Sequence, residues 1–424
     1  MIDFFSAKNG ILHAEDVPLT HLATEFGTPL YVYSQASIEY QFKTLSDALK
    51  KHLPADRQPL LCYACKANSN IAILSLLKSL GSGLEIVSEG ELARGLKAGF
   101  EGQKIISTSF GKSKAEISAC LDTDILQFNI ECVDELNSIS ETAKAKNKQA
   151  DVVFRINPDV AGGGHDKINT GRKEDKFGNN ADKILELYKL AESLDNIQPV
   201  GVSVHIGSQV FNVQSFKPAF EKLAEIVKLL RSNGHEVRVL DIGGGFPIIY
   251  NDENNLDLDS YAQWVRDIIL PLDVDIQMEP GRYMVGNAGV LLSRVEYIKT
   301  TDVRQFMVLD SGMNDLIRPA LYESFHLIEA VEHRDAEIET YDVVGPICES
   351  GDIFAKNRQI QNVNAGDLVV FRSAGAYGYT MASNYNSRPL PAEVLVSGNQ
   401  YKLINKRQSL DEMMARESIP EWVK

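Results

Sequence analysis

LLCYACKAN, at residues 60–68, joins a five-residue β-rich run to a lysine and a polar turn. Seven similar runs follow before residue 280, and longer amphipathic segments separate them. Alternation of short strands with helices is typical of βα units and a parallel sheet. The seven runs are LEIVS (84–88), KIIST (104–108), ILQFN (125–129), DVVFRIN (151–157), VGVSVHI (200–206), VRVLDI (237–242) and VDIQME (274–279).

Eight parallel strands with intervening helices are the inventory of a (β/α)8 TIM-type barrel. Two of the connecting segments, 181–194 and 216–233, repeat apolar residues every three or four positions, as amphipathic helices do. Pro218 lies near the start of the second segment, where a helix tolerates proline. Active sites of such barrels are built on the loops at the carboxyl ends of the strands. The polar residues that follow the eight runs are therefore the candidates for chemistry.

After residue 285 the pattern changes to strand-like pieces bounded by Gly, Asp and Asn, such as GVLLSRVEYIKT, RQFMVLD and DLVVFRS. This texture predicts a separate all-β domain of the Greek-key sandwich or barrel-like kind. Near the amino terminus, GILHAED and PLYVYS are also strand-like and could join it. We therefore predict an α/β chain with a barrel over residues 30–284 and a β domain over 1–29 and 285–424.

Composition excludes several classes of function. The 424 residues are 44% hydrophobic and 24% charged, which is ordinary globular usage. A formal net charge of −15, with no run of Lys or Arg, argues against a nucleic-acid partner. The opening MIDFFSAKNG lacks the basic and apolar regions of a signal peptide, and no stretch approaches the roughly 20 apolar residues that span a bilayer. We expect a cytoplasmic protein that binds neither nucleic acid nor membrane.

The five cysteines indicate neither a disulfide framework nor a metal centre. Their number is odd, and Cys62 and Cys65 have no second CxxC pair to complete a zinc site. The pair lies inside the apolar run LLCYAC, which is typical of core cysteines on a strand. No metal is expected.

Three strand ends carry groups with complementary chemistry. Lys66 directly follows the first run, where an amine can form a Schiff base with a carbonyl. Gly243, Gly244 and Gly245 follow the seventh run, and successive bare N–H groups there can cradle a phosphate. The eighth run ends in MEPGRY, which brings Glu279 and Arg282 to the same mouth. Taken singly, each has an ordinary alternative: a surface lysine, a plain turn, and a Glu–Arg ion pair.

The sixth strand end adds an imidazole. HIGSQ places His205 where it could lie against a ring and Ser208 where it could reach a phosphate, although a lone histidine is more often structural. Arg155, at the end of the fifth run, could support that histidine. An amine, an imidazole, a phosphate cradle and a carboxylate at one mouth fit pyridoxal phosphate, because its aldehyde, ring face, phosphate and ring nitrogen each find a partner.

The motifs resemble those of the diaminopimelate decarboxylases, in the alanine-racemase-like (fold-type III) class of pyridoxal-phosphate enzymes. The resemblance covers nearly the whole chain in order. It implies a barrel with a β domain, and a homodimer whose active sites lie at the subunit interface. The motifs are YACKAN, HIGSQ, LDIGGGFP, MEPGRYMVGNAGVLL, MNDLIRPALY, GPICESGD and GAYGYTMASNYNSRPLPAEVL.

The resemblance also implies roles for individual residues. Lys66 would carry the cofactor and His205 would stack on its ring, while Glu279 would pair with the pyridine nitrogen. Cys348 would donate a proton and Glu349 would lie near the substrate amine, both from the neighbouring subunit. The remaining cofactor contacts would be Ser208, Gly243, Gly244, Gly245, Pro280, Gly281, Arg282 and Tyr377, and the substrate contacts Arg282, Arg318, Tyr322, Glu349 and Tyr377.

The resemblance implies decarboxylation of meso-2,6-diaminopimelate to L-lysine and carbon dioxide, the last step of lysine biosynthesis. The reaction leaves a carbanion that the protonated ring delocalises, and an acid such as Cys348 then returns a proton. Diaminopimelate has a second carboxylate for Arg318, which ornithine lacks. The alternatives are a polyamine-pathway decarboxylase acting on ornithine, arginine or carboxynorspermidine, an alanine racemase, and a non-catalytic pyridoxal-phosphate carrier.

One segment departs from the family pattern. The loop NPDVAGGGHDKINTGRKEDKFG has small residues at 161–164, where the family usually has bulkier ones. A glycine-rich stretch favours a mobile lid over residues 161–178, and we assign His165 no catalytic role.

Overall fold

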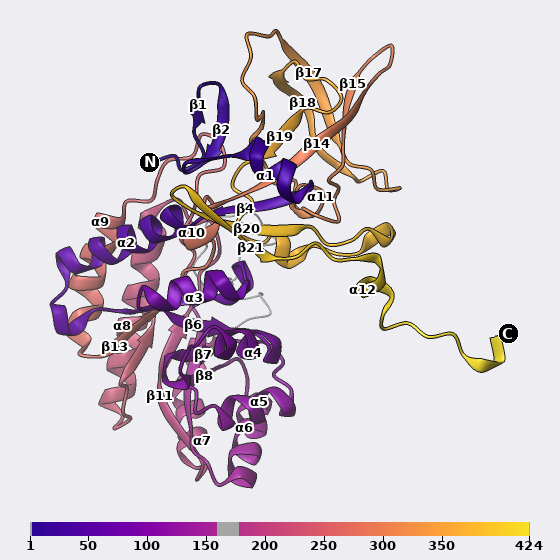
Figure 1. Cartoon of the computed structure of the whole chain (residues 1–424). Coiled ribbons are helices and arrows are strands. Elements are labelled where there is room, and N and C mark those ends of the chain that lie inside the picture. The colour runs from indigo at the N-terminus through magenta and orange to yellow at the C-terminus, as the bar shows by residue number, and fades with distance from the viewer. Residues whose placement is uncertain (1, 159–177, 424) are drawn as a thin grey trace. The chain divides into compact units, whose positions relative to one another are not determined.

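The computed structural model describes residues 2–158 and 178–423, and the predicted lid lies almost wholly outside them. The described residues form two compact units, drawn in Figure 1. The barrel unit comprises residues 39–158, 178–249 and 253–284, and the sheet unit comprises residues 2–38, 250–252 and 285–423.

Eight parallel strands close into a barrel in the first unit, because β8 and β9 pair with each other as well as with their other neighbours. This confirms the predicted (β/α)8 architecture. The short strand β10 (Asn179–Asn180) adds to β9 outside the ring. The barrel strands are β5 (Leu60–Ala64), β6 (Gly83–Ile86), β7 (Ile105–Ser107), β8 (Gln127–Ile130), β9 (Ala150–Asn157), β11 (Ile197–Val204), β12 (Val239–Asp241) and β13 (Asp275–Met278).

Helices flank these strands in the barrel unit (Figure 1). In α8 (Phe216–Ser232), the buried residues Phe216, Phe220, Leu223, Val227 and Leu230 recur every three or four positions and form one apolar face. The others are α2 (Gln35–His52), which begins in the sheet unit, α3 (Ile71–Ser79), α4 (Glu89–Lys97), α5 (Lys114–Asp122), α6 (Val133–Lys146), α7 (Ile184–Glu192), α9 (Leu258–Trp264) and α10 (Arg282–Val285). None of the helices among the described residues is long and apolar enough to cross a membrane.

The sheet unit contains a nine-stranded sheet of mixed direction, built around the long strand β14. Pairs β4–β20 and β15–β17 are parallel, and the other pairs are antiparallel. The strands are β4 (Leu30–Ser34), β14 (Gly289–Thr300), β15 (Gln305–Leu309), β16 (Ile328–Ala330), β17 (Ile338–Val344), β18 (Ile353–Gln361), β19 (Leu368–Phe371), β20 (Ala392–Ser397) and β21 (Gln400–Asn405).

A small antiparallel sheet and three short helices complete this unit. The sheet is formed by β1 (Ala7–Lys8), β2 (Ile11–Ala14) and β3 (Val17–Pro18), and the helices are α1 (Leu19–Phe26), α11 (Arg318–Tyr322) and α12 (Leu410–Met414). Strand β4 pairs with β14 and β20, so residues 30–38 lie in the sheet unit. The predicted domain boundary at residue 30 instead assigns this segment to the barrel, although the strand-like run PLYVYS is also a candidate for the β domain.

Candidate active site

Lys66 lies in the short helical turn η2 (Cys65–Ala67), which directly follows barrel strand β5. Its Nζ is 3.0 Å from both carboxylate oxygens of Glu85. The lysine side chain is 37% exposed, and the glutamate side chain is 0% exposed. Burial raises the pKa of Glu85, and the positive charge of Lys66 opposes that rise. The amine therefore sits at the carboxyl end of a strand, accessible, and with a buried carboxylate fixing its position.

Glu279 directly follows strand β13 and lies at the centre of a buried polar network. Its Oε1 accepts hydrogen bonds from the Thr108 hydroxyl at 2.8 Å and the Asn129 amide at 3.4 Å. Asn129 also donates to Asp241 at 2.8 Å. Burial, and then the negative charge of Asp241, raise the pKa of Glu279 to about 8, whereas Lys66 lowers it. A carboxyl group that binds a proton this readily is suited to share one with a ring nitrogen.

The three glycines form a turn, and its central position, Gly244, has no room for a side chain. Gly243 and Gly245 have φ of 73° and 93°, and a Cβ on Gly244 would lie 2.2 Å from the carbonyl oxygen of Glu279. The Gly243 N–H donates to Asp241 at 2.9 Å, and the Gly244 N–H points to Nδ1 of His205 at 3.3 Å. This turn therefore connects the predicted phosphate cradle to the imidazole.

His205 follows strand β11 and is partly buried. Burial lowers the pKa of its imidazole well below the usual value, and the charges of Arg155 and Lys66 add to the effect. A neutral, flat ring results, which suits stacking on another ring. Arg155 is itself paired with the buried Glu131 at 2.8 Å, so it acts on His205 through its charge.

Arg282 begins helix α10 and is 7% exposed, with its NH2 3.2 Å from the Ser208 hydroxyl. The intervening Pro280 and Gly281 pack against the first barrel strand: the Ala64 N–H donates to the Pro280 carbonyl at 3.1 Å, and a Cβ on Gly281 would lie 2.9 Å from that of Ala64. The EPGR segment is thereby fixed to the strand that precedes Lys66.

The predicted residues of the sheet unit lie on three segments. Arg318 and Tyr322 begin and end α11, four residues apart and so on one side of that turn. Arg318 is buried, and its NH1 lies 3.0 Å from Nε2 of His326. Tyr377 has φ of 56°, a conformation unusual for a residue with a side chain.

Cys348 and Glu349 are exposed on the loop between β17 and β18. Buried Asp352 shapes this loop by accepting hydrogen bonds from the backbone N–H groups of Ile347 and Met313, both at 2.7 Å. The Cys348 N–H donates to the Asn386 side chain at 2.7 Å. The Cys348 thiol is thus exposed to solvent, while Asp352 and Asn386 fix the backbone at Ile347 and Cys348 by hydrogen bonds.

Sequence patterns missed several residues that the structure places beside the predicted ones. Glu85 and Asp241 lie within the runs LEIVS and VRVLDI, and their signal was a carboxylate inside an otherwise apolar strand. Thr108 and Asn129 are ordinary polar residues at the ends of the predicted runs KIIST and ILQFN, so the sequence offers no signal for them. His326 was missed because no spacing rule predicts its contact with Arg318.

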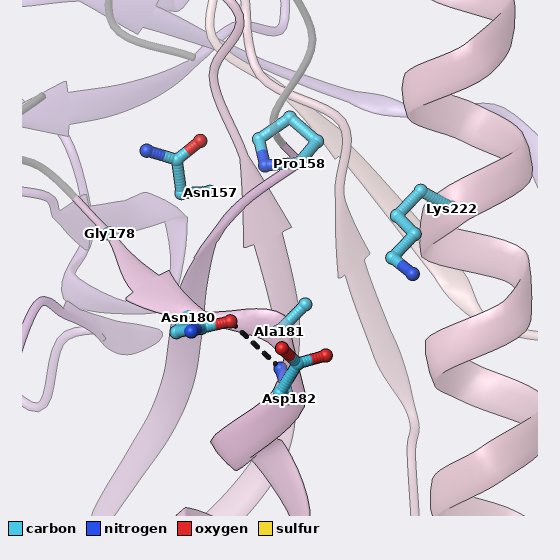
Figure 2. Close-up of a pocket in the computed structure, with 7 residues that line it drawn as sticks. All are labelled: Asn157, Pro158, Gly178, Asn180, Ala181, Asp182 and Lys222. Atoms are coloured by element: carbon cyan, nitrogen blue, oxygen red, sulfur yellow. Dashed lines mark hydrogen bonds between the residues drawn. The ribbon is translucent and has the colours of Figure 1, made fainter. Parts of the chain in front are cut away.

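A separate hollow of about 510 Å³ opens beside the carboxyl end of β9 in the barrel unit (Figure 2). None of the described residues that line it is a predicted site residue, and the Asp182 N–H donates a hydrogen bond to the Asn180 side chain there at 3.1 Å. The lining is Asn157, Pro158, Gly178, Asn180, Ala181, Asp182 and Lys222.

The barrel rim residues fit pyridoxal phosphate as a group. The accessible amine of Lys66 suits the aldehyde of that cofactor, and the neutral imidazole of His205 suits its ring. The buried carboxyl group of Glu279, with its raised pKa, suits the ring nitrogen, and the glycine turn beside the Ser208–Arg282 pair suits the phosphate. Comparison agrees, since residues 35–286 match the family described as the pyridoxal binding domain of pyridoxal-dependent decarboxylases.

Full-length relatives narrow the class. The diaminopimelate decarboxylase of Neisseria meningitidis serogroup B is 46% identical over 406 residues, which are 96% of this chain and 97% of that protein. The Helicobacter pylori diaminopimelate decarboxylase, solved with L-lysine, aligns with a TM-score of 0.89 at 38% identity over 94% of this chain and 98% of that one. The diaminopimelate decarboxylase of M. jannaschii, solved in complex with L-lysine, aligns with a TM-score of 0.94 at 34% identity. The alignment covers 99% of this chain and 98% of that one.

The chain belongs to the diaminopimelate decarboxylase family. This confirms the family that the motifs indicated, and with it pyridoxal phosphate as the cofactor.

Proposed function

We propose that the protein decarboxylates meso-2,6-diaminopimelate at its D-configured carbon and releases L-lysine and carbon dioxide, the last step of lysine biosynthesis. The observation that carries the proposal is the set of groups on one barrel rim, Lys66, His205, Glu279 and the glycine turn, in a chain 46% identical to a diaminopimelate decarboxylase. Relatives solved with L-lysine support the product.

The barrel residues are proposed to hold and tune the cofactor. Bound pyridoxal phosphate supplies a protonated ring that delocalises the electron pair left when the carboxylate departs. Lys66 would anchor the aldehyde, and the Glu279 carboxyl group would pair with the protonated ring nitrogen. The Ser208 hydroxyl and the Arg282 guanidinium, which lie 3.2 Å apart, would bind the phosphate.

The sheet-unit residues are proposed to recognise and protonate the substrate. Arg318 and Tyr322 bind the distal carboxylate, and Glu349 binds the distal amine. The bond between the α-carbon and the reacting carboxylate breaks to give carbon dioxide, and a proton from the Cys348 thiol takes its place on the same carbon. The product has one amine and one carboxylate at its retained end, as L-lysine does. Tyr377 contacts the cofactor phosphate or the substrate.

Purified protein loaded with pyridoxal phosphate tests the reaction. The expected result is lysine and carbon dioxide from meso-diaminopimelate, with no putrescine from ornithine and no agmatine from arginine. Either polyamine product in place of lysine would move the assignment to polyamine synthesis. No product from any substrate, despite cofactor bound at Lys66, would favour a carrier.

We further propose a cytoplasmic homodimer in which Cys348 and Glu349 serve the neighbouring subunit. Lys66→Ala and Cys348→Ser are each expected to be inactive alone. If sites are shared, dissociating and reassociating equal amounts restores about a quarter of the wild-type activity, because half the dimers are mixed and each mixed dimer has one intact site. No restored activity in mixtures that form mixed dimers would show that each chain supplies its own thiol.

A further inference from the structure

Arg318 is held by a histidine to which the proposed reaction assigns no role. Both side chains are buried, Arg318 at 6% and His326 at 2% residue exposure. The Arg318 NH1 lies 3.0 Å from Nε2 of His326, and Nδ1 of the same ring lies 2.8 Å from the carbonyl oxygen of Arg372. One imidazole thus bridges a guanidinium and a backbone carbonyl.

These two contacts define the charge and tautomer of His326. A guanidinium can only donate, so Nε2 must offer a lone pair, and a carbonyl can only accept, so Nδ1 must carry the hydrogen. His326 is therefore neutral and protonated on Nδ1. Protonating it would set a second cation and a second donor against Arg318, which the geometry disfavours.

Aromatic contacts fix the same pair from a second direction. The Cζ of Arg318 lies 4.9 Å from the ring centroid of Tyr250, and the Tyr250 and His326 rings meet edge to face at 5.4 Å and 84°. The His326 carbonyl accepts from Arg358 at 3.1 Å. Arg318 is therefore held by the His326 imidazole and by the Tyr250 ring. His326 is itself held through both its side chain and its backbone carbonyl.

We propose that His326, together with Tyr250, is a positioning residue that sets specificity for a distal carboxylate. A long arginine side chain binds a carboxylate well only when its planar donors are already oriented. His326 fixes that orientation before substrate arrives, so it favours ligands with the distal carboxylate over those without it. The inference rests on the proposed function, which gives Arg318 that carboxylate to bind.

Binding of two ligands to the holoenzyme separates positioning from general structure. L-Lysine retains the distal carboxylate, and pentane-1,5-diamine lacks it. His326→Phe, which keeps an aromatic ring and removes the acceptor, is expected to weaken L-lysine binding by about ten- to a hundredfold, the worth of one charged hydrogen bond. The diamine should bind as in the wild type, and the KM for diaminopimelate should rise with kcat little changed.

Three variants complete the design. His326→Gln offers an amide oxygen to Arg318 and should recover part of the L-lysine affinity. Tyr250→Leu removes the ring contact without touching His326 and should reduce the same affinity selectively, which keeps the proposal testable if His326→Phe folds poorly. His333→Gln alters an exposed histidine paired with Glu329 and should change neither ligand.

Equal weakening of both ligands in the folded variants would show that His326 is merely structural and would overturn the proposal. Unchanged L-lysine binding would overturn it as well. Failure of the proposed function looks different, because wild-type protein would then bind L-lysine no better than the diamine.

Discussion

Glu279→Gln is predicted to stabilise the cofactor-free protein while weakening its hold on the cofactor. The wild-type carboxyl group is 5% exposed, and burial followed by the charge of Asp241 raises its pKa to about 8, from an ordinary value of 4.5. Glutamine has nearly the same shape and does not titrate, so the substitution removes the cost of burying an ionisable acid without opening a cavity.

The direction and size of the effect follow from linkage. Between pH 4.5 and 8 the folded chain binds this proton more tightly than the unfolded chain, so the free energy of unfolding falls as pH rises through that window. At pH 7, about 2.5 units above the unfolded pKa, the loss is about 3 kcal/mol, at 1.36 kcal/mol per unit. Glu279→Gln should not show this loss in the free energy of unfolding, because glutamine does not titrate.

Urea denaturation of the cofactor-free proteins between pH 5 and pH 8 measures the difference. Trp264 lies in helix α9 of the barrel unit, so its fluorescence in a Trp422→Phe background reports that unit. Glu141→Gln, an exposed glutamate paired with Lys114, controls for the charge change. Identical pH slopes for wild type and Glu279→Gln would refute the reasoning, because Glu279 would then not titrate in this window.

Two further predictions concern the buried ion pair of the barrel unit and the exposed thiol. Lys112→Met should lower the free energy of unfolding by about 3–5 kcal/mol, because it leaves buried Glu135 unpaired, whereas Lys114→Met at an exposed pair should change it by less than about 1 kcal/mol in the same denaturation assay. Cys348→Ser should reduce kcat by about 10²–10⁴ with the cofactor still bound, as expected for a lost proton donor, whereas Cys132→Ser, also exposed, should leave kcat unchanged. Equal effects within either matched pair would contradict the role assigned.

Much of the fold could be predicted because the barrel depends on local patterns. Each strand run is short and β-rich, and the runs match the observed strands to within a few residues. Segment 30–38 was less tractable, since its assignment depends on β4 pairing with strands more than 250 residues away. Long-range pairing of that kind leaves no local trace.

The candidate site was predictable only where function imposes an unusual local sequence. A glycine triplet, and a lysine at a strand end, are visible as letters. Thr108 and Asn129 are not, because their importance lies in which side chains they meet inside the barrel: both donate to Glu279, and Asn129 also donates to Asp241. Such contacts depend on strand register, which a single sequence does not specify.

Borohydride reduction of the holoenzyme, followed by peptide mass mapping, tests directly whether Lys66 on the barrel rim holds the cofactor. The reagent fixes pyridoxal phosphate permanently to the amine that holds it. We expect one phosphopyridoxyl group per chain, located on Lys66, and its loss when meso-diaminopimelate is present in excess during reduction. A label on any other lysine would show that the active site is not on the barrel rim. A label on Lys66 that excess substrate does not diminish would show the same.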